Sequence, residues 1–146
     1  MKKVSILGAT GSIGLNTLEV ISRHPEKYKV FALSANKSWE KMNSLCKIHM
    51  PTYAILIDPD AAENLRQIAP EEVTVLSGEN ALIEIVSHKE TDYVMAAIVG
   101  SAGMSSTFAA VTAGKRVMLA NKESLVLAGD LLINASKKSG AELIPV

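Results

Sequence analysis

The chain alternates short apolar runs with amphipathic segments, and this alternation constrains its fold more than any other feature. Seven runs have the length and composition of strands, and most are apolar on both faces: residues 4–7, 30–33, 53–57, 73–76, 93–98, 116–119 and 142–146. Six segments between them have helical character: residues 12–23, 38–48, 61–68, 80–87, 107–113 and 122–138. Strands that are apolar on both faces are typical of parallel sheets with helices on both sides. The alternation therefore predicts an α/β protein with a doubly wound, mainly parallel sheet of about seven strands.

The first predicted helix and the helix ends follow ordinary rules. Ile13, Leu18 and Ile21 are expected to share the apolar face of the helix at residues 12–23. Gly114 and Gly140 come directly after the fifth and sixth helical segments, where glycine commonly ends a helix.

The totals fit one domain over residues 1–146 and exclude several classes of protein. Lys and Arg together number 15, as do Asp and Glu, so there is no basic excess for non-specific binding to nucleic acid. Cys46 is the single cysteine, which excludes an internal disulfide and is consistent with a cytoplasmic location. The longest apolar stretch, residues 94–104, contains two glycines and is too short for a membrane span. We expect neither nucleic acid nor membrane as a partner.

Three of the nine glycines, Gly8, Gly11 and Gly14, lie between the first strand and the first helix. In dinucleotide-binding folds, such a loop cradles the pyrophosphate: one glycine makes the turn, one leaves room for the ligand, and one lets the helix pack on the sheet. The helix N-terminus then adds free N–H groups and the positive end of its dipole. A glycine-rich turn without a ligand is the alternative. Since the loop follows the first strand of an α/β protein, we favour a Rossmann-like dinucleotide site.

The end of the second strand favours NADP over NAD. An NAD site usually has an acidic residue there, which binds the ribose 2′-hydroxyl. Here Ser34, Ala35 and Asn36 take that place, followed by Lys37 and Ser38. An ammonium and a hydroxyl would bind a 2′-phosphate, which a carboxylate would repel. Alternatively, Lys37 is a solvated loop residue and Ser38 caps the next helix.

Two further segments follow strand ends. A small-residue loop containing Gly100 and Gly103 comes after the fifth strand and would let a flat ligand lie against the backbone, unless it is only a close-packed turn. After the sixth strand, Asn121 is a candidate cap, and Lys122 and Glu123 open a helix. A lysine at that position faces the positive end of the helix dipole, which a bound anion would offset. Taken alone, Lys122 would be a solvent-exposed lysine.

Catalytic and metal-ligating groups are not evident in the sequence. His24, His49 and His88 are scattered without the spacing of a metal site. Cys46 lies in a predicted helix away from the strand ends, so we do not expect a nucleophile there. We therefore predict no metal ligand and no catalytic residue within this chain.

The sequence blocks "GATGSIG", "MAAIVGSAG" with "AAVTAGK", and "LANKESLVLAG" occur in this order, and the likeness continues to "LIPV" at the end. Together they resemble the 1-deoxy-D-xylulose 5-phosphate reductoisomerase family. The resemblance implies an NADPH-binding domain of an enzyme in non-mevalonate isoprenoid biosynthesis. The family rearranges 1-deoxy-D-xylulose 5-phosphate on Mg²⁺ or Mn²⁺ and reduces it with NADPH to 2-C-methyl-D-erythritol 4-phosphate. The resemblance also implies that the full-length enzyme is a homodimer.

Residue roles follow from the same motif match. The resemblance implies that Thr10, Gly11, Ser12 and Ile13 contact the cofactor near its pyrophosphate. Near the 2′-phosphate it implies contacts from Asn36, Lys37 and Ser38, and near the nicotinamide half from Gly100, Asn121 and Glu123. Lys122 would contact the phosphorylated sugar substrate.

The sequence departs from the family pattern at single positions, and it covers only part of that pattern. The family usually has serine at Ala9, a glycine near Asn36 and proline at Ser106. Its metal ligands, an Asp-Ser-Glu block, would begin just after Val146, and its catalytic and C-terminal domains would follow. The resemblance thus implies a fragment that is inactive alone.

Two other classes stay open at this level. An aspartate-semialdehyde-type dehydrogenase also uses a "GATG" loop with NADP, but it needs a downstream cysteine nucleophile, and Cys46 comes too early. A stand-alone NADP-sensing module would need an output surface, such as a basic DNA-binding helix, and no segment is basic enough.

Overall fold

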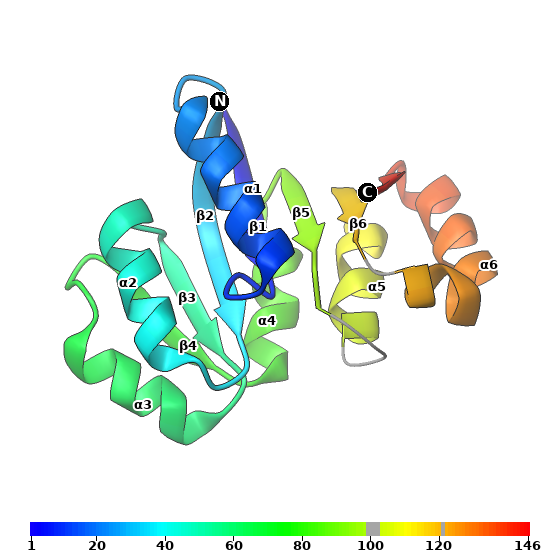
Figure 1. Ribbon diagram of the computed structural model, residues 1–146. Helices are drawn as coiled ribbons and strands as arrows, with labels where there is room; N and C mark the ends of the chain where they lie inside the picture. The colour runs from blue at the N-terminus through cyan, green and yellow to red at the C-terminus, as the bar shows by residue number, and fades with distance from the viewer. Residues whose placement is uncertain (99–102, 121) are drawn as a thin grey trace.

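The computed structural model describes residues 1–98, 103–120 and 122–146. The described residues form one sheet of parallel strands in the order β4-β3-β2-β1-β5-β6-β7. The strands are β1 (Lys2–Leu7), β2 (Tyr28–Ala35), β3 (Tyr53–Leu56), β4 (Thr74–Ser77), β5 (Tyr93–Ala96), β6 (Arg116–Leu119) and β7 (Glu142–Pro145). The helices between them are α1 (Ser12–Arg23), α2 (Trp39–His49), α3 (Pro59–Ile68), α4 (Glu79–Val86), α5 (Met104–Thr112) and α6 (Lys122–Ser139) (Figure 1). The predicted α/β class with a doubly wound sheet is confirmed.

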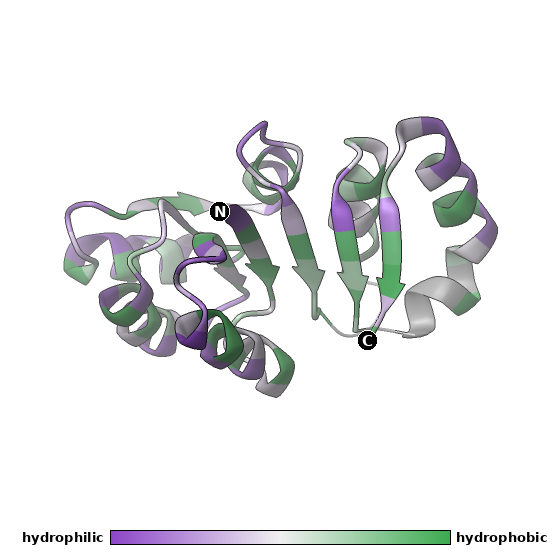
Figure 2. Ribbon diagram, turned by 90° about the horizontal axis from the view of Figure 1, so that it is seen from above, coloured by the Kyte–Doolittle hydropathy of each residue, from purple (hydrophilic) through white to green (hydrophobic). Residues whose placement is uncertain are grey.

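The helices form two layers, one on each face of the sheet. The first three pack into one buried cluster with the sheet, through Leu18 of α1, Met42 of α2 and Leu65 of α3. The last three pack into a second cluster, through Leu82 of α4, Val111 of α5 and Leu132 of α6. In Figure 2, the helices carry both hydrophilic and hydrophobic segments, as expected of amphipathic helices that cover a sheet. Both faces of the sheet are therefore buried, which explains the apolar character of its strands.

The strand order reverses between β1 and β5. From β1 the chain winds outward through β2 and β3 to β4, and α4 then brings it back to β5 on the other side of β1. Parallel strands end at the same edge of a sheet, so the chain leaves β1, β2, β3 and β5 at that edge. Such a switch point is where open α/β sheets bind ligands.

One packing expectation for α1 was wrong. Ile13 is 39% exposed, whereas Leu18 and Ile21 are buried as predicted, at 1% and 7%. The buried face continues instead to Gly14, because positions 14, 18 and 21 follow the i, i+4, i+7 spacing of one helix face. Ile13 lies in the first turn, at the end of the helix that faces the glycine loop.

Some element boundaries also differ from those predicted. α5 begins at Met104, three residues before the predicted start at 107, and its buried Ser106 donates a hydrogen bond to the carbonyl oxygen of Gly103 at 3.2 Å. α6 is not one regular helix, because Ala128 has non-helical backbone angles. Gly114 and Gly140 follow α5 and α6 with φ of +78° and +79°, as helix-ending glycines do. Of the helices described, none is both long and apolar enough to span a membrane.

Candidate functional site

Gly8 and Gly14 are required by the protein's own packing. Gly8 has φ of +76°, and a Cβ atom there would lie 2.8 Å from the carbonyl oxygen of Ala97, at the end of β5. A Cβ on Gly14 would lie 2.5 Å from the carbonyl oxygen of Gly8 and 2.7 Å from the Cα of Ala9. All three distances are shorter than real contacts, so these two glycines hold the loop tightly between β1, β5 and α1.

Gly11 is different, because the protein itself does not need a glycine there. Its backbone angles, φ −81° and ψ 172°, are open to any residue. A Cβ atom would meet only the carbonyl oxygen of Gly8, at an ordinary 3.6 Å. The missing side chain therefore leaves open space on the outer side of the loop, where a ligand could approach the backbone.

The N-terminus of α1 is suited to an anion. Gly11 stands at the N-cap position, no side chain caps the helix, and no acidic residue lies in its first turn. The first intrahelical hydrogen bond joins the N–H of Leu15 to the carbonyl oxygen of Gly11. The N–H groups of the turn before it are left for another partner, and the helix dipole favours a negative one.

Ser34 supports the glycine loop from the neighbouring strand. The side chain is 1% exposed, and its Oγ accepts a hydrogen bond from the N–H of Gly8 at 3.4 Å. The carbonyl oxygen of Ser34 accepts a second one from Ala9, at 2.8 Å. In the sequence, Ser34 occupies the place of the usual ribose-binding acid; in the structure, it connects β2 to the loop after β1.

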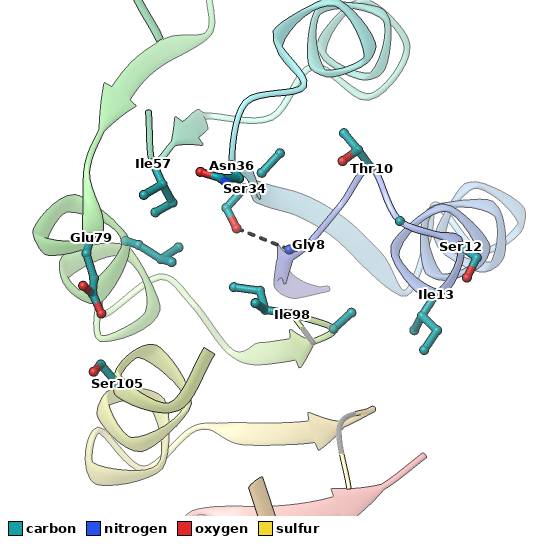
Figure 3. Close-up of a pocket in the computed structure, with 14 residues that line it drawn as sticks. Gly8, Thr10, Ser12, Ile13, Ser34, Asn36, Ile57, Glu79, Ile98 and Ser105 are labelled. Carbon is teal, nitrogen blue, oxygen red and sulfur yellow. Dashed lines mark hydrogen bonds between the residues drawn. The ribbon is translucent and has the colours of Figure 1, made fainter. Parts of the chain in front are cut away.

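A cavity of about 800 Å³ lies at this edge of the sheet. Its walls come from the ends of β1, β2, β3 and β5 and from α1, α4 and α5 (Figure 3). The lining residues are Gly8, Thr10, Gly11, Ser12, Ile13, Ser34, Ala35, Asn36, Ile57, Glu79, Leu82, Ala97, Ile98 and Ser105. The cavity is therefore at the switch point between β1 and β5, where the topology leads one to look.

The structure brings together five of the ten predicted cofactor-binding residues in this cavity. Those five are Thr10, Gly11, Ser12, Ile13 and Asn36. Lys37 and Ser38 follow Asn36 directly and are exposed, but they do not line the cavity. Ser38 takes the N-cap position of α2 without a capping hydrogen bond from its side chain. Its hydroxyl is thus not used for the capping that the sequence offered as an alternative.

The remaining predicted contacts cannot be placed in the cavity. Gly100 and Asn121 lie outside the described residues. Lys122 and Glu123 are the first two residues of α6, and only their backbone is described. The predicted roles of these four residues stay predictions.

Sequence reasoning missed the part of the cavity wall that lies away from the glycine loop. Ile57 was predicted as the last residue of the third strand, and it instead follows β3 and lines the cavity. Glu79 and Ser105 come from the first turns of α4 and α5. Of these three residues, only Ile57 could have been identified from the sequence, by its position at a strand end. Glu79 and Ser105 reach the cavity because the winding of the chain brings the starts of α4 and α5 to this edge of the sheet.

Cys46, Trp39 and Asp58 lie in the structural framework and do not line the cavity. Cys46 is fully buried, and burial raises the pKa of its thiol to about 11, so it is poorly suited to act as a nucleophile. Trp39 is partly buried against the core cluster of α1–α3. Asp58 caps α3 by accepting a hydrogen bond from the N–H of Ala61 at 2.9 Å. Within the described part of the chain, no group of three or more His, Cys, Asp or Glu side chains is placed to hold a metal ion.

Comparison with known proteins gives consistent results. Residues 4–129 match the family model of 1-deoxy-D-xylulose 5-phosphate reductoisomerase. The 1-deoxy-D-xylulose 5-phosphate reductoisomerases of Vesicomyosocius okutanii and Nitrosococcus oceani are 55% and 54% identical to the chain, over 100% and 98% of its length. The chain spans 38% and 37% of these two relatives, so it corresponds to little more than a third of them.

Solved structures match the fold closely. The reductoisomerase from Zymomonas mobilis in complex with NADPH is 41% identical, with a TM-score of 0.93 over 99% of this chain and 38% of its own. A DOX-P reductoisomerase in complex with NADPH, fosmidomycin and magnesium is 46% identical, with a TM-score of 0.94 over 99% of this chain and 36% of its own.

Proposed function

The chain belongs to the 1-deoxy-D-xylulose 5-phosphate reductoisomerase family, and from this premise we propose that it is a domain that binds NADPH for the reaction of that family. The proposed enzyme rearranges 1-deoxy-D-xylulose 5-phosphate and reduces the product to 2-C-methyl-D-erythritol 4-phosphate. The observation that carries the proposal is Gly11. It lines a cavity at the switch point, at the uncapped start of a helix, in a position where the protein's own packing does not require a glycine.

The glycine loop would hold the pyrophosphate. The backbone N–H groups at the start of α1 donate to its oxygens, with the helix dipole adding to the attraction. Thr10 and Ser12 line the cavity on either side of Gly11 and offer hydroxyl groups to the same anion. The absence of an acid from the first turn of α1 removes a competing negative charge.

The loop after β2 would select NADPH over NADH. Asn36 lines the cavity, and the exposed Lys37 and Ser38 come next in the chain. An ammonium group binds a 2′-phosphate as a point charge and gains little from a 2′-hydroxyl. The hydroxyl of Ser38 is not engaged in capping α2, so it is open to the same phosphate.

The reacting end of the cofactor and the sugar phosphate are assigned through the family pattern. Gly100, Asn121 and Glu123 would contact the nicotinamide half, and Lys122 would attract the phosphorylated substrate. NADPH supplies the hydride when bound. A divalent metal, Mg²⁺ or Mn²⁺, would hold the substrate oxygens, and the family's Asp-Ser-Glu ligands for it would lie outside the 146 residues. The proposed task of this chain is thus to bind and orient the cofactor.

A full-length homodimer and a cytoplasmic location belong to the same proposal. The first is implied by the family resemblance, and the second is supported by a single, buried cysteine. Family membership removes the aspartate-semialdehyde-type dehydrogenase from consideration. A stand-alone NADP sensor would use the same cavity, and it differs from the proposed domain only in lacking any role in turnover.

The direct test is titration of the chain with NADPH and with NADH, followed by the fluorescence of the reduced nicotinamide and of Trp39. We expect saturable binding of NADPH and distinctly weaker binding of NADH. Failure of NADPH to bind, with the circular dichroism spectrum of a folded α/β protein, would contradict the proposal. Equal binding of the two cofactors would leave a dinucleotide site but remove its assignment to NADPH.

A further inference from the structure

The cavity has a second half whose chemistry differs from that of the glycine loop. Ile57, Leu82 and Ile98 give it apolar walls, and Glu79 contributes the one carboxylate of the lining. In Figure 3, Ile57 and Glu79 lie on one side of the cavity, and Ser12 and Ile13 lie on the opposite side. This half, which we call the distal slot, has no cationic side chain among its lining residues.

Glu79 is positioned by the start of α4. It is the first residue of that helix, and it follows Gly78, whose φ of +93° turns the chain sharply before the helix begins. Its carboxylate makes no ion pair with any residue in the described part of the chain. An unpaired carboxylate repels phosphate and accepts hydrogen bonds from neutral donors. The distal slot therefore fits a flat, apolar group that carries a hydrogen-bond donor.

The order of the cavity walls indicates which part of a dinucleotide reaches the distal slot. The glycine loop follows β1, Asn36 follows β2, and Ile57 follows β3, and these strands are neighbours in the sheet. If the pyrophosphate lies at the first and the ribose 2′-phosphate at the second, the base lies at the third. This placement rests on the proposed function. It brings the base between Ile57 and the α4 residues Glu79 and Leu82.

We propose that Glu79 is a specificity-determining residue that recognises the 6-amino group of adenine. The exocyclic amine donates to the carboxylate while the ring lies against the apolar walls. A base with a carbonyl oxygen at that position, such as hypoxanthine, places an acceptor opposite an acceptor and loses the bond. Ser105, whose hydroxyl lines the same cavity from α5, is able to donate or accept and does not discriminate between the two bases.

The test compares NADPH with the reduced form of nicotinamide hypoxanthine dinucleotide phosphate, which has a carbonyl oxygen in place of the 6-amino group and a proton on the neighbouring N1. Both are titrated against the unaltered chain, Glu79→Ala, Glu79→Gln and the matched control Glu84→Ala. Glu84 is an exposed acid on the same helix that does not line the cavity, so its replacement removes the same charge elsewhere. Urea unfolding of each variant checks that the fold is retained.

We expect the unaltered chain and Glu84→Ala to prefer NADPH by about tenfold, the lower end for a hydrogen bond to a charged group, because Glu79 is exposed. Glu79→Ala should weaken the binding of NADPH and bring the affinities for NADPH and for the hypoxanthine analogue within about twofold of each other. Glu79→Gln should keep the affinity for NADPH and gain affinity for the hypoxanthine analogue, because an amide both accepts and donates.

Three results would overturn the inference. Equal binding of the two cofactors by the unaltered chain would show that the 6-position is not recognised. An equal loss of both in Glu79→Ala would show that Glu79 contacts another part of the dinucleotide. A preference that survives in Glu79→Ala would assign the discrimination to another residue. In each of these cases the unaltered chain still binds NADPH. Failure of both cofactors to bind the unaltered chain would instead refute the proposed function.

Discussion

Replacement of Gly11 by alanine separates the needs of a ligand from those of the fold. In the structure, the added Cβ meets only the carbonyl oxygen of Gly8 at 3.6 Å, and the backbone angles suit alanine. Alanine is a poorer N-cap residue than glycine, but it also reduces the entropy of the unfolded chain, and the two effects are each of about 0.5–1 kcal/mol with opposite sign. We expect the free energy of unfolding of Gly11→Ala to stay within about 1 kcal/mol of the original.

The effect on binding should be much larger. The new methyl group fills the space through which the pyrophosphate would approach the N–H groups of α1. Loss of one charge-assisted hydrogen bond corresponds to about 1.5–3 kcal/mol, or roughly ten- to hundredfold in affinity for NADPH. Gly11→Val, with a larger side chain in the same space, should abolish binding.

Gly14→Ala is the matched control, because its Cβ would lie 2.5 Å from the carbonyl oxygen of Gly8. Such an overlap with backbone atoms should lower the free energy of unfolding by about 1–3 kcal/mol. Urea unfolding followed by circular dichroism measures stability, and titration with NADPH measures binding. Unchanged NADPH affinity in a folded Gly11→Ala variant would refute the reasoning, since the phosphate would then lie elsewhere. Equal destabilisation by the two substitutions would show that the loop geometry is wrong.

Three further predictions concern single groups or the whole chain. Lys37→Ala should weaken NADPH by about tenfold, the lower end for a charge-assisted bond since the lysine is exposed, and leave NADH nearly unchanged; an equal loss for both would assign Lys37 to another role. The 146-residue chain should not oxidise NADPH when 1-deoxy-D-xylulose 5-phosphate and Mg²⁺ or Mn²⁺ are added, as followed by nicotinamide absorbance beside a full-length homologue, and turnover above a blank would contradict this. With a pKa raised to about 11, only about one Cys46 thiol in a thousand is ionised at pH 8, so a thiol reagent should react slowly with the folded chain and rapidly after unfolding in urea; equal rates in the two states would contradict the burial.

Local patterns were enough to predict the elements and the sheet class. The bounds of α1 and β6 match the prediction, and most other boundaries differ by one to three residues, because apolar period and glycine position act over a few neighbouring residues. The failure at Ile13 has a local cause as well. The pattern shows three apolar residues that could share a face, but the close approach of Gly14 to the glycine loop sets the rotation of the helix.

The candidate cofactor site was predictable only in part. The glycine loop and Asn36 are continuous with predicted strand ends, and the structure places them in one cavity. The involvement of Ser34 in supporting Gly8 was not predictable, because it depends on the pairing of β1 with β2. Lys37 and Ser38 follow Asn36 but do not line the cavity, and α2 begins at the next residue, Trp39.

By itself, the sequence determined which residues form strands and helices, where a glycine-rich loop suited to a phosphate lies, and to which family the chain is similar. These properties depend on residues that are close together in the chain, so they can be identified without knowing the order of the strands in the sheet. Only the tertiary structure decided that α4 and α5 complete the cavity with Glu79 and Ser105. The physical reason is the return of the chain from β4 across β1 to β5, which brings helix starts that are distant in sequence to the edge where β1 ends.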